Sequence, residues 1–368
     1  MWIIRHSYRT FAGGRPRRWN GRLNMVTVAA ALLLSLTGGR GTAFAAAKPD
    51  ASIGGLNAKF ADVNGVQARY YEAGQGEPMV MIHGGFWAGS STANVWSRNI
   101  PGLAKRFHVF AVDRLASGMS GDPLDDKDYN YEGDVNFIYQ FIQTLKLGPV
   151  HLVGHSAGGA IALFLAIEHP EVVKTLVIIA AGPEDPNAIA GPTKLDAALK
   201  KCPDQSQYDG LKCRVSILAW LPTTFDDEYW EADAYMAGLP KSREARAKLI
   251  AGAGEPLRSK EYPAWRDKML DRVKSDGVVQ VPVLLYAGKN DVLDWAANDE
   301  TAKLQRELAL FDVLAAKNTK VRMIILNNGG HFMYREYPEQ FNQDLIGFVE
   351  YWAHHPEGTP QGRAQGPQ

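Results

Sequence analysis

A serine lies inside a glycine-flanked motif near the middle of the 368-residue chain. Residues 154–158 read Gly-His-Ser-Ala-Gly, after an apolar run and before a stretch of good helix formers. Such a motif places the serine on a sharp strand-to-helix turn, where its hydroxyl stands clear of the sheet. The helix N-terminus also favours negative charge beside it. We therefore predict that Ser156 is a nucleophile; the alternative is an ordinary serine at a glycine-rich junction.

A serine hydroxyl is a weak nucleophile, so it needs a base and an acid that orients the base. His331 follows an Asn-Gly-Gly segment just past an apolar run, and we predict that it is the base. Asp291 comes directly after the apolar run at residues 281–288, and we predict that it is the orienting acid. Three other carboxylates are rivals for that role: Asp294, Glu184 and Asp185.

Two backbone N–H groups must stabilise the charge that develops on the carbonyl oxygen under attack. One is predicted to come from Ala157, the residue after the nucleophile. The other is predicted to come from the His-Gly-Gly-Phe segment at residues 83–86, with Gly85 preferred over Phe86 as the donor. Chemistry of this kind needs no metal and no organic cofactor.

The elements that must position these residues follow from the pattern of apolar runs. Two alternating stretches, residues 58–63 and 67–73, bracket Asn64-Gly65 and predict an antiparallel hairpin. Later runs lack alternation, which indicates strands buried on both faces of a parallel sheet. These runs lie at residues 78–83, 108–114, 151–154, 175–181, 281–288 and 321–327. The predicted fold class is α/β: a mostly parallel sheet with an N-terminal antiparallel hairpin.

A long segment rich in aromatic residues lies between the apolar run at residues 175–181 and the run at residues 281–288. Residues 183–278 are helical in pattern and too long for a connecting loop, so we predict a helical lid. The alternative is a packing extension with its own small core. The lid divides a core of residues 48–182 and 279–355, and the Pro- and Gly-rich tail at residues 356–368 is expected to be disordered.

The first 47 residues have the order of a secretory leader: arginines, an apolar stretch at residues 25–36, and then alanines. We expect cleavage near Ala45 or Ala47, by either the general or the twin-arginine route, and a periplasmic or secreted protein. A membrane anchor is the alternative, but the apolar stretch is shorter than the ~20 residues that a spanning helix needs. No stable membrane insertion is expected after cleavage.

Cysteine and charge content add two expectations. Cys202 and Cys213 are the only cysteines, and in an exported chain they are predicted to form a disulfide; two free thiols are the alternative. Lys and Arg together number 40, as do Asp and Glu, so nothing in the charge favours a nucleic acid partner. The predicted partner is a small-molecule substrate, and the sequence gives no oligomeric state.

Together these residues resemble the α/β-hydrolase superfamily, and several short motifs are similar to its lidded branch. The motifs lie at residues 63–65, 83–85, 113–114, 117–120 and 330–332. The resemblance implies an α/β-hydrolase fold and an activity among esterases, lactonases, haloperoxidases, epoxide hydrolases or carbon–carbon bond hydrolases. Serine at position 156 disfavours the epoxide hydrolases and haloalkane dehalogenases, which have aspartate there.

Residues 83–89 and 95–100 look like those of hydrolases that cleave vinylogous diketones from aromatic ring fission. Those enzymes usually have Trp after the catalytic His, where this chain has Phe332, and they act in the cytoplasm. The main expectation is therefore an exported serine hydrolase of a carboxylic ester or lactone with an apolar or aromatic part. A carbon–carbon bond hydrolase is the first alternative, and a non-catalytic binding protein is the second.

Overall fold

An eight-stranded sheet with the order β1-β2-β4-β3-β5-β6-β7-β8 forms the centre of the computed structural model. The structure describes residues 49–85, 91–181, 194–204, 208–253, 261–293 and 302–357. The predicted leader, most of the predicted tail, Phe86 and the three rival carboxylates lie outside these residues. The strands are β1 (Ala58–Val63), β2 (Val66–Ala73), β3 (Glu77–Ile82), β4 (Phe107–Val112), β5 (Val150–His155), β6 (Val173–Ile179), β7 (Val283–Gly288) and β8 (Val321–Leu326).

The strand pairing confirms the predicted fold class. β1 and β2 form an antiparallel hairpin, and β2 is also antiparallel to β4. Asn64 and Gly65 form the turn between β1 and β2, with φ of 51° and 87°. The two-residue hairpin turn expected for Asn-Gly requires positive φ at both of these residues. All pairs from β3 to β8 are parallel, so their carboxyl ends meet at one edge of the sheet.

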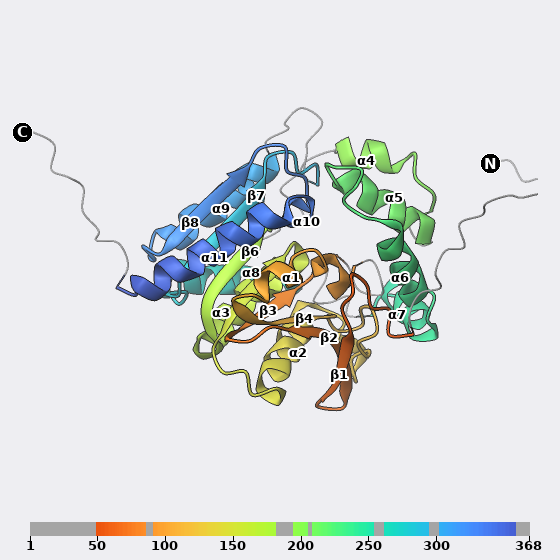
Figure 1. Cartoon of the computed structure of the whole chain (residues 1–368), viewed down its shortest axis with the longest axis horizontal. Coiled ribbons are helices and arrows are strands. Elements are labelled where there is room, and N and C mark those ends of the chain that lie inside the picture. The colour runs from red at the N-terminus through yellow and green to blue at the C-terminus, as the bar shows by residue number, and fades with distance from the viewer. Residues whose placement is uncertain are drawn as a thin grey trace, which may run out of the picture. The chain divides into compact units, whose positions relative to one another are not determined.

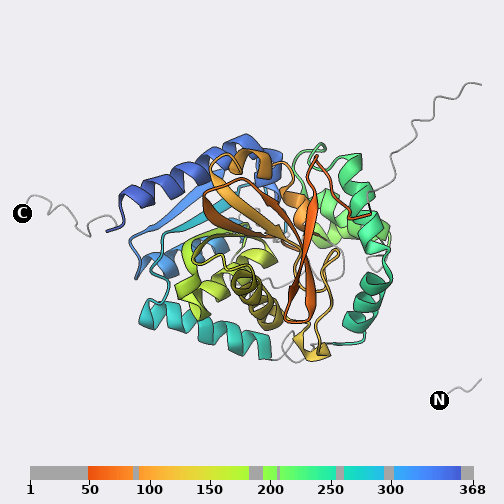
Figure 2. The same cartoon turned by 60° about the horizontal axis from the view of Figure 1, so that its bottom comes forward.

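Helices cover both faces of the sheet, and Figure 2 shows α11 along one face and α8 along the other. Alternation along β3 separates the two cores: Val80 and Ile82 belong to one apolar cluster, Met79 and Met81 to the other. The first cluster includes residues of α2 (Tyr131–Thr144), α3 (Ala157–Glu168), α8 (Glu261–Asp276) and α9 (Ala302–Ala315). The second includes residues of α1 (Ile100–Leu103), α10 (Met333–Glu336) and α11 (Pro338–His354). Three short 3₁₀ turns are also present in the described residues: η1 (Ala93–Trp96), η2 (Asp126–Asp128) and η3 (Pro170–Val172).

Between β6 and β7, helices α4 to α7 gather at one side of the sheet (Figure 1). They are α4 (Lys194–Leu199), α5 (Tyr208–Leu218), α6 (Asp227–Ala237) and α7 (Pro240–Ile250). We call the described residues 194–253 the helical insertion. α8 also falls within the predicted lid range, but its Trp265 ring lies 4.5 Å from that of Phe164 in α3, so it packs on the core.

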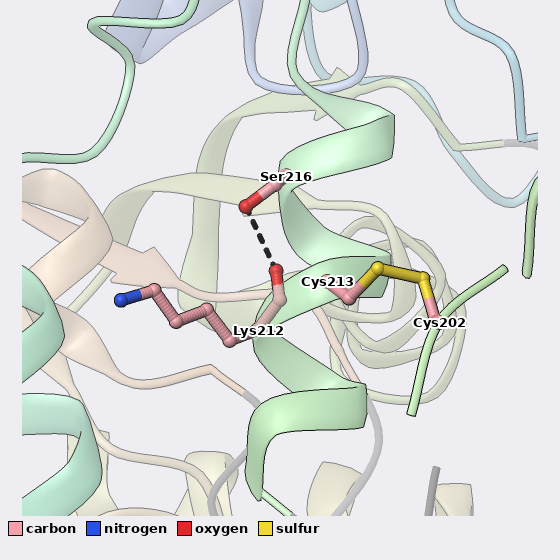
Figure 3. Close-up of a disulfide and its surroundings, with 4 residues drawn as sticks. All are labelled: Cys202, Lys212, Cys213 and Ser216. Atoms are coloured by element: carbon pink, nitrogen blue, oxygen red, sulfur yellow. Dashed lines mark hydrogen bonds between the residues drawn. A yellow bond between two sulfur atoms is a disulfide. The ribbon is translucent and has the colours of Figure 1, made fainter. Parts of the chain in front are cut away.

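A disulfide joins Cys202, which follows α4, to Cys213 within α5, with their Cα atoms 5.7 Å apart (Figure 3). The structure therefore has the predicted pair of cysteines bonded to each other. It links two consecutive helices of the helical insertion and makes no covalent link to the sheet. Over the described ranges, no helix is both long and apolar enough to cross a membrane.

Candidate active site

Ser156 occupies the turn between β5 and α3 with φ 52° and ψ −124°. A non-glycine residue in this region of backbone space costs about 1–3 kcal/mol, which the surrounding structure must offset. Part of that support is visible: Ser156 N donates to Ile179 O at 2.8 Å. The flanking glycines are needed because a Cβ on Gly154 would lie 2.1 Å from Gly158 O. Local sterics thus explain why this motif forms the sharp turn that was predicted.

His331 and Asp291 lie side by side although 40 residues separate them in sequence. His331 Nδ1 donates to Asp291 Oδ2 at 2.6 Å, and Leu293 N donates to the other carboxylate oxygen at 3.0 Å. Both side chains are buried. With the proton on Nδ1, the neutral imidazole keeps Nε2 as a proton acceptor, which is the arrangement that a general base requires.

His155 connects Ser156 to the loop that carries His331. Its Nε2 donates to His331 O at 2.8 Å, and the two imidazole rings lie 4.6 Å apart. Tyr334 OH donates to His155 Nδ1 at 3.3 Å. Because His155 directly precedes Ser156, these contacts hold the loop that carries His331 beside the Ser156 turn. Sequence reasoning assigned no role to His155; its position before the serine was the available signal.

The predicted oxyanion segment runs beside Ser156. A Cβ on Gly84 would lie 2.7 Å from the Cβ of Ser156, so the backbone here passes directly against Ser156. Ala157 is the first residue of α3, and an N–H in that position has no acceptor within its own helix. In the predicted oxyanion segment, Gly85 comes directly after Gly84, and its backbone φ is 81°. The assignment of Ala157 and Gly85 as the two donors stays a prediction, and Phe86 lies outside the described residues.

His83 and Arg114 fix the backbone of this segment. His83 Nδ1 donates to Gly84 O at 2.8 Å, while His83 Nε2 accepts from Arg114 N at 3.0 Å. Burial lowers the pKa of His83 to about 3, so it is neutral near pH 7 and suited to accepting that bond. Arg114 Nη1 donates to Gly85 O at 2.8 Å, and Nη2 donates to Asp134 at 2.6 Å. These residues hold the loop in place.

Phe332, the residue after the predicted base, contacts both the core and the helical insertion. Its ring centroid lies 5.2 Å from that of His155 and 4.9 Å from that of Phe225. Phe225 comes between α5 and α6, so an aromatic contact joins the insertion to the residues next to His331 and Ser156. The position where this chain departs from the ring-fission hydrolases therefore lies at the site.

The sequence model of the α/β hydrolase fold family matches residues 77–338. Over 284 residues, the chain is 28% identical to the 2-hydroxymuconate semialdehyde hydrolase of Pseudomonas sp. (strain CF600), covering 77% of this chain and 90% of that protein. It is 37% identical over 122 residues to the 2-hydroxy-6-oxo-6-(2'-aminophenyl)hexa-2,4-dienoic acid hydrolase of Metapseudomonas resinovorans, where the match spans 33% of this chain and only 41% of the relative.

Solved structures show the same fold. A meta-cleavage product hydrolase from Pseudomonas fluorescens IP01 superposes with a TM-score of 0.62 at 21% identity, covering 80% of this chain and 97% of the other. The strand order, the strained serine turn and the family match over most of the chain agree with one another. The chain belongs to the α/β hydrolase fold family, and it is an enzyme of the hydrolase class.

Proposed function

We propose that this chain hydrolyses a carbon–carbon bond in a vinylogous diketone of the kind that aromatic ring fission produces. The observation that carries this proposal is the match to the 2-hydroxymuconate semialdehyde hydrolase, which extends over 90% of that protein. The comparisons thus favour the first alternative of the sequence analysis over its main expectation of ester hydrolysis. The catalytic groups would be Ser156 as nucleophile, His331 as base and Asp291 as orienting acid.

In the proposed reaction, Ser156 Oγ adds to the ketone carbonyl, or to the aldehyde carbonyl in 2-hydroxymuconate semialdehyde, as its proton passes to His331 Nε2. The N–H groups of Ala157 and Gly85 stabilise the oxyanion. The oxyanion collapses, the carbon–carbon bond breaks, and its electron pair leaves with the dienolate, which takes the proton from His331. Water, activated by His331, then releases the acyl group. One water is consumed, and the products are a carboxylic acid and a shorter 2-hydroxydienoate.

Ester hydrolysis is the second candidate, because the same steps cleave an ester with an alkoxide as the leaving group. Phe332 favours it, since the ring-fission hydrolases usually have tryptophan at that position. A lipophilic ester also suits the aromatic residues of the helical insertion, such as Phe225 and Trp230, whose rings lie 5.1 Å apart. In both candidates, we propose that the helical insertion is a lid over the substrate.

One experiment separates the two candidates. Purified protein and its Ser156→Ala variant are assayed on 2-hydroxymuconate semialdehyde, by the loss of its colour, and on p-nitrophenyl acetate. We expect kcat/KM to be higher on the ring-fission product, and Ser156→Ala to lower it by about 10⁴-fold or more with unchanged circular dichroism. A higher kcat/KM on the ester would select the second candidate. Turnover that survives in the variant would exclude the serine mechanism.

We also propose that the protein is exported and loses its leader near Ala45 or Ala47. The basic, apolar and alanine-rich order of residues 1–47 supports this, and so does the disulfide, which persists in oxidising compartments. The intact mass of protein recovered from the cell envelope or the medium tests it, because a retained leader adds the mass of those residues.

A further inference from the structure

The loop that carries His331 is attached to the helical insertion as well as to Asp291. His331 N donates to Leu218 O at 3.0 Å, and Leu218 is the last residue of α5. The preceding residue, Gly330, lies against the same segment, since a Cβ on it would be 2.6 Å from Trp220 N. The backbone of the base loop and the end of α5 are therefore in direct contact.

Glu336 in α10 bridges these two backbones. One of its carboxylate oxygens accepts from Trp220 N at 2.7 Å, and the other accepts from Gly330 N at 2.9 Å. The side chain is buried, with 7% of the residue exposed. A buried carboxylate is unfavourable unless hydrogen bonds satisfy it, and here each oxygen has a backbone donor. Burial raises the pKa of Glu336, while the two N–H groups oppose that rise.

We propose that Glu336 is a positioning residue: by accepting from Gly330 N and Trp220 N, it holds His331 in register with Ser156 and couples the insertion to the reactivity of the serine. The proposal rests on the serine mechanism proposed above. A displacement of about 1 Å in a reacting group costs on the order of 100-fold in rate. Loss of one bridge bond beside the base is therefore expected to slow the chemical step more than it weakens substrate binding.

Arg335, the neighbouring residue, holds the insertion independently of Glu336. Arg335 Nε donates to Thr224 O at 2.8 Å, and Nη1 donates to Ser97 Oγ in the core at 2.9 Å. Its guanidinium also lies 5.0 Å from the ring centroid of Tyr229 in α6. Because these contacts persist when Glu336 is changed, we expect a Glu336 variant to keep the insertion attached and the fold intact.

The test compares Glu336→Gln with wild type and with Glu339→Gln, a matched change of an exposed glutamate at the start of α11. A small alkyl fluorophosphonate reports on the serine: Oγ attacks phosphorus, fluoride leaves, and the base takes the hydroxyl proton. It makes no demand on the substrate pocket. Labelling rates, kcat, KM and Tm are measured, with all rates taken well below Tm.

In Glu336→Gln, the side-chain NH₂ replaces one carboxylate oxygen and faces a backbone N–H. Two donors cannot bond to each other, so one of the two hydrogen bonds to Gly330 N and Trp220 N is lost. We expect the labelling rate and kcat to fall together by about 10- to 100-fold, with KM changing far less. Glu336→Asp, which is too short to reach both donors, is expected to show the same split. Glu339→Gln is expected to match wild type in all four measurements.

Gly330→Ala tests the same coupling with Glu336 itself unsubstituted, although the added Cβ would also lie 3.0 Å from Glu336 Oε1 and crowd that carboxylate. The added Cβ would lie 2.9 Å from Trp220 Cβ as well as 2.6 Å from Trp220 N, so it separates the insertion from the base loop. A parallel fall in labelling rate would support the proposal. Wild-type labelling rates in Glu336→Gln or Glu336→Asp, with only Tm lowered, would overturn it and leave the proposed function standing. A wild-type protein that no fluorophosphonate labels would overturn both.

Discussion

The strands and helix around Ser156 and the helical insertion are built in opposite ways. Every residue of β5 is buried, and so are residues Ala157 to Ile167 of α3. In α5, by contrast, the buried residues are only Gly210 and Leu218, and in α7 they are Ser242 and Ala245. The first region is held by hydrophobic burial on two sides of a sheet, whereas the apolar burial of the insertion is concentrated in Phe225 and in α6, with Tyr229 and Met236.

Specific polar and covalent contacts add to this apolar packing in the helical insertion. Cys202 and Cys213 join α4 to α5, and Lys248 in α7 pairs with Asp126 of the core at 2.9 Å. The buried residues Arg335 and Glu336 supply the contacts nearest to the site. The comparison teaches that Ser156 lies between two almost wholly buried elements, whereas α5 and α7 bury little and depend more on a few contacts that single substitutions can remove.

The largest effect is expected on the scaffold side, at Asp291. Asp291→Asn keeps the shape of the side chain but replaces the carboxylate with a neutral amide. The amide no longer keeps the proton of His331 on Nδ1, so the imidazole can take the wrong tautomer. We expect kcat to fall by about 10³- to 10⁴-fold, with Tm little changed. Steady-state kinetics check this against Asp271→Asn, an exposed change in α8 that is expected to be silent. An effect smaller than tenfold would show that another carboxylate orients the base.

An intermediate effect is expected at the disulfide. The double variant Cys202→Ser/Cys213→Ser removes a bond that closes a loop of 11 residues, worth roughly 3 kcal/mol in the chain-entropy model. If the helical insertion unfolds separately from the sheet, the lost stability shows first in the unfolding transition followed by tryptophan fluorescence, to which Trp220 and Trp230 contribute. The unfolding transition followed by far-ultraviolet circular dichroism then comes later. Ser216→Ala, which removes only a nearby hydroxyl in α5, is the control. Coincident transitions that both fall by the full amount would show a single cooperative unit.

The smallest effect is expected at Asp233 in α6. Burial raises the pKa of Asp233 to about 7, so the folded protein retains a proton that the unfolded chain releases near pH ~4. Its contribution to stability is therefore present below pH ~4 and is lost as the pH rises towards 7. Asp233→Asn, which mimics the protonated form, is expected to raise Tm by about 2 °C or more at pH 8 and by little at pH 4. An equal change at both pH values would contradict the raised pKa.

Much of the fold could be predicted because its signals are local. The apolar runs at residues 78–83 and 321–327 became β3 and β8 to within a residue or two. β3 is largely buried, as such a run predicts, but β8 lies at the edge of the sheet and is only partly buried, so its predicted burial on both faces was wrong. The Asn64-Gly65 turn was equally readable, because few residue pairs adopt positive φ in succession. The order serine, acid, histidine also indicated candidates that the structure places at the carboxyl edge of the sheet.

Other features could not be read from local patterns. α8 carries the same helical periodicity as α4 to α7, so nothing in its sequence says that Trp265 packs on Phe164 of the core. The roles of His155 and Glu336 depend on acceptors and donors that lie more than 100 residues away, as in the bond from Trp220 N to Glu336. The periodicity of apolar residues shows which face of a helix or strand is buried. It does not show which other element packs against that face.

The sequence by itself determined the sheet, the hairpin and the serine at residue 156, because backbone sterics and apolar periodicity act over a few neighbouring residues. Only the tertiary structure decided that Asp291 lies against His331 and that Glu336 joins the base loop to the helical insertion. Those contacts arise when the carboxyl ends of parallel strands converge at one edge of the sheet. The strand order that brings them there is a property of the whole fold.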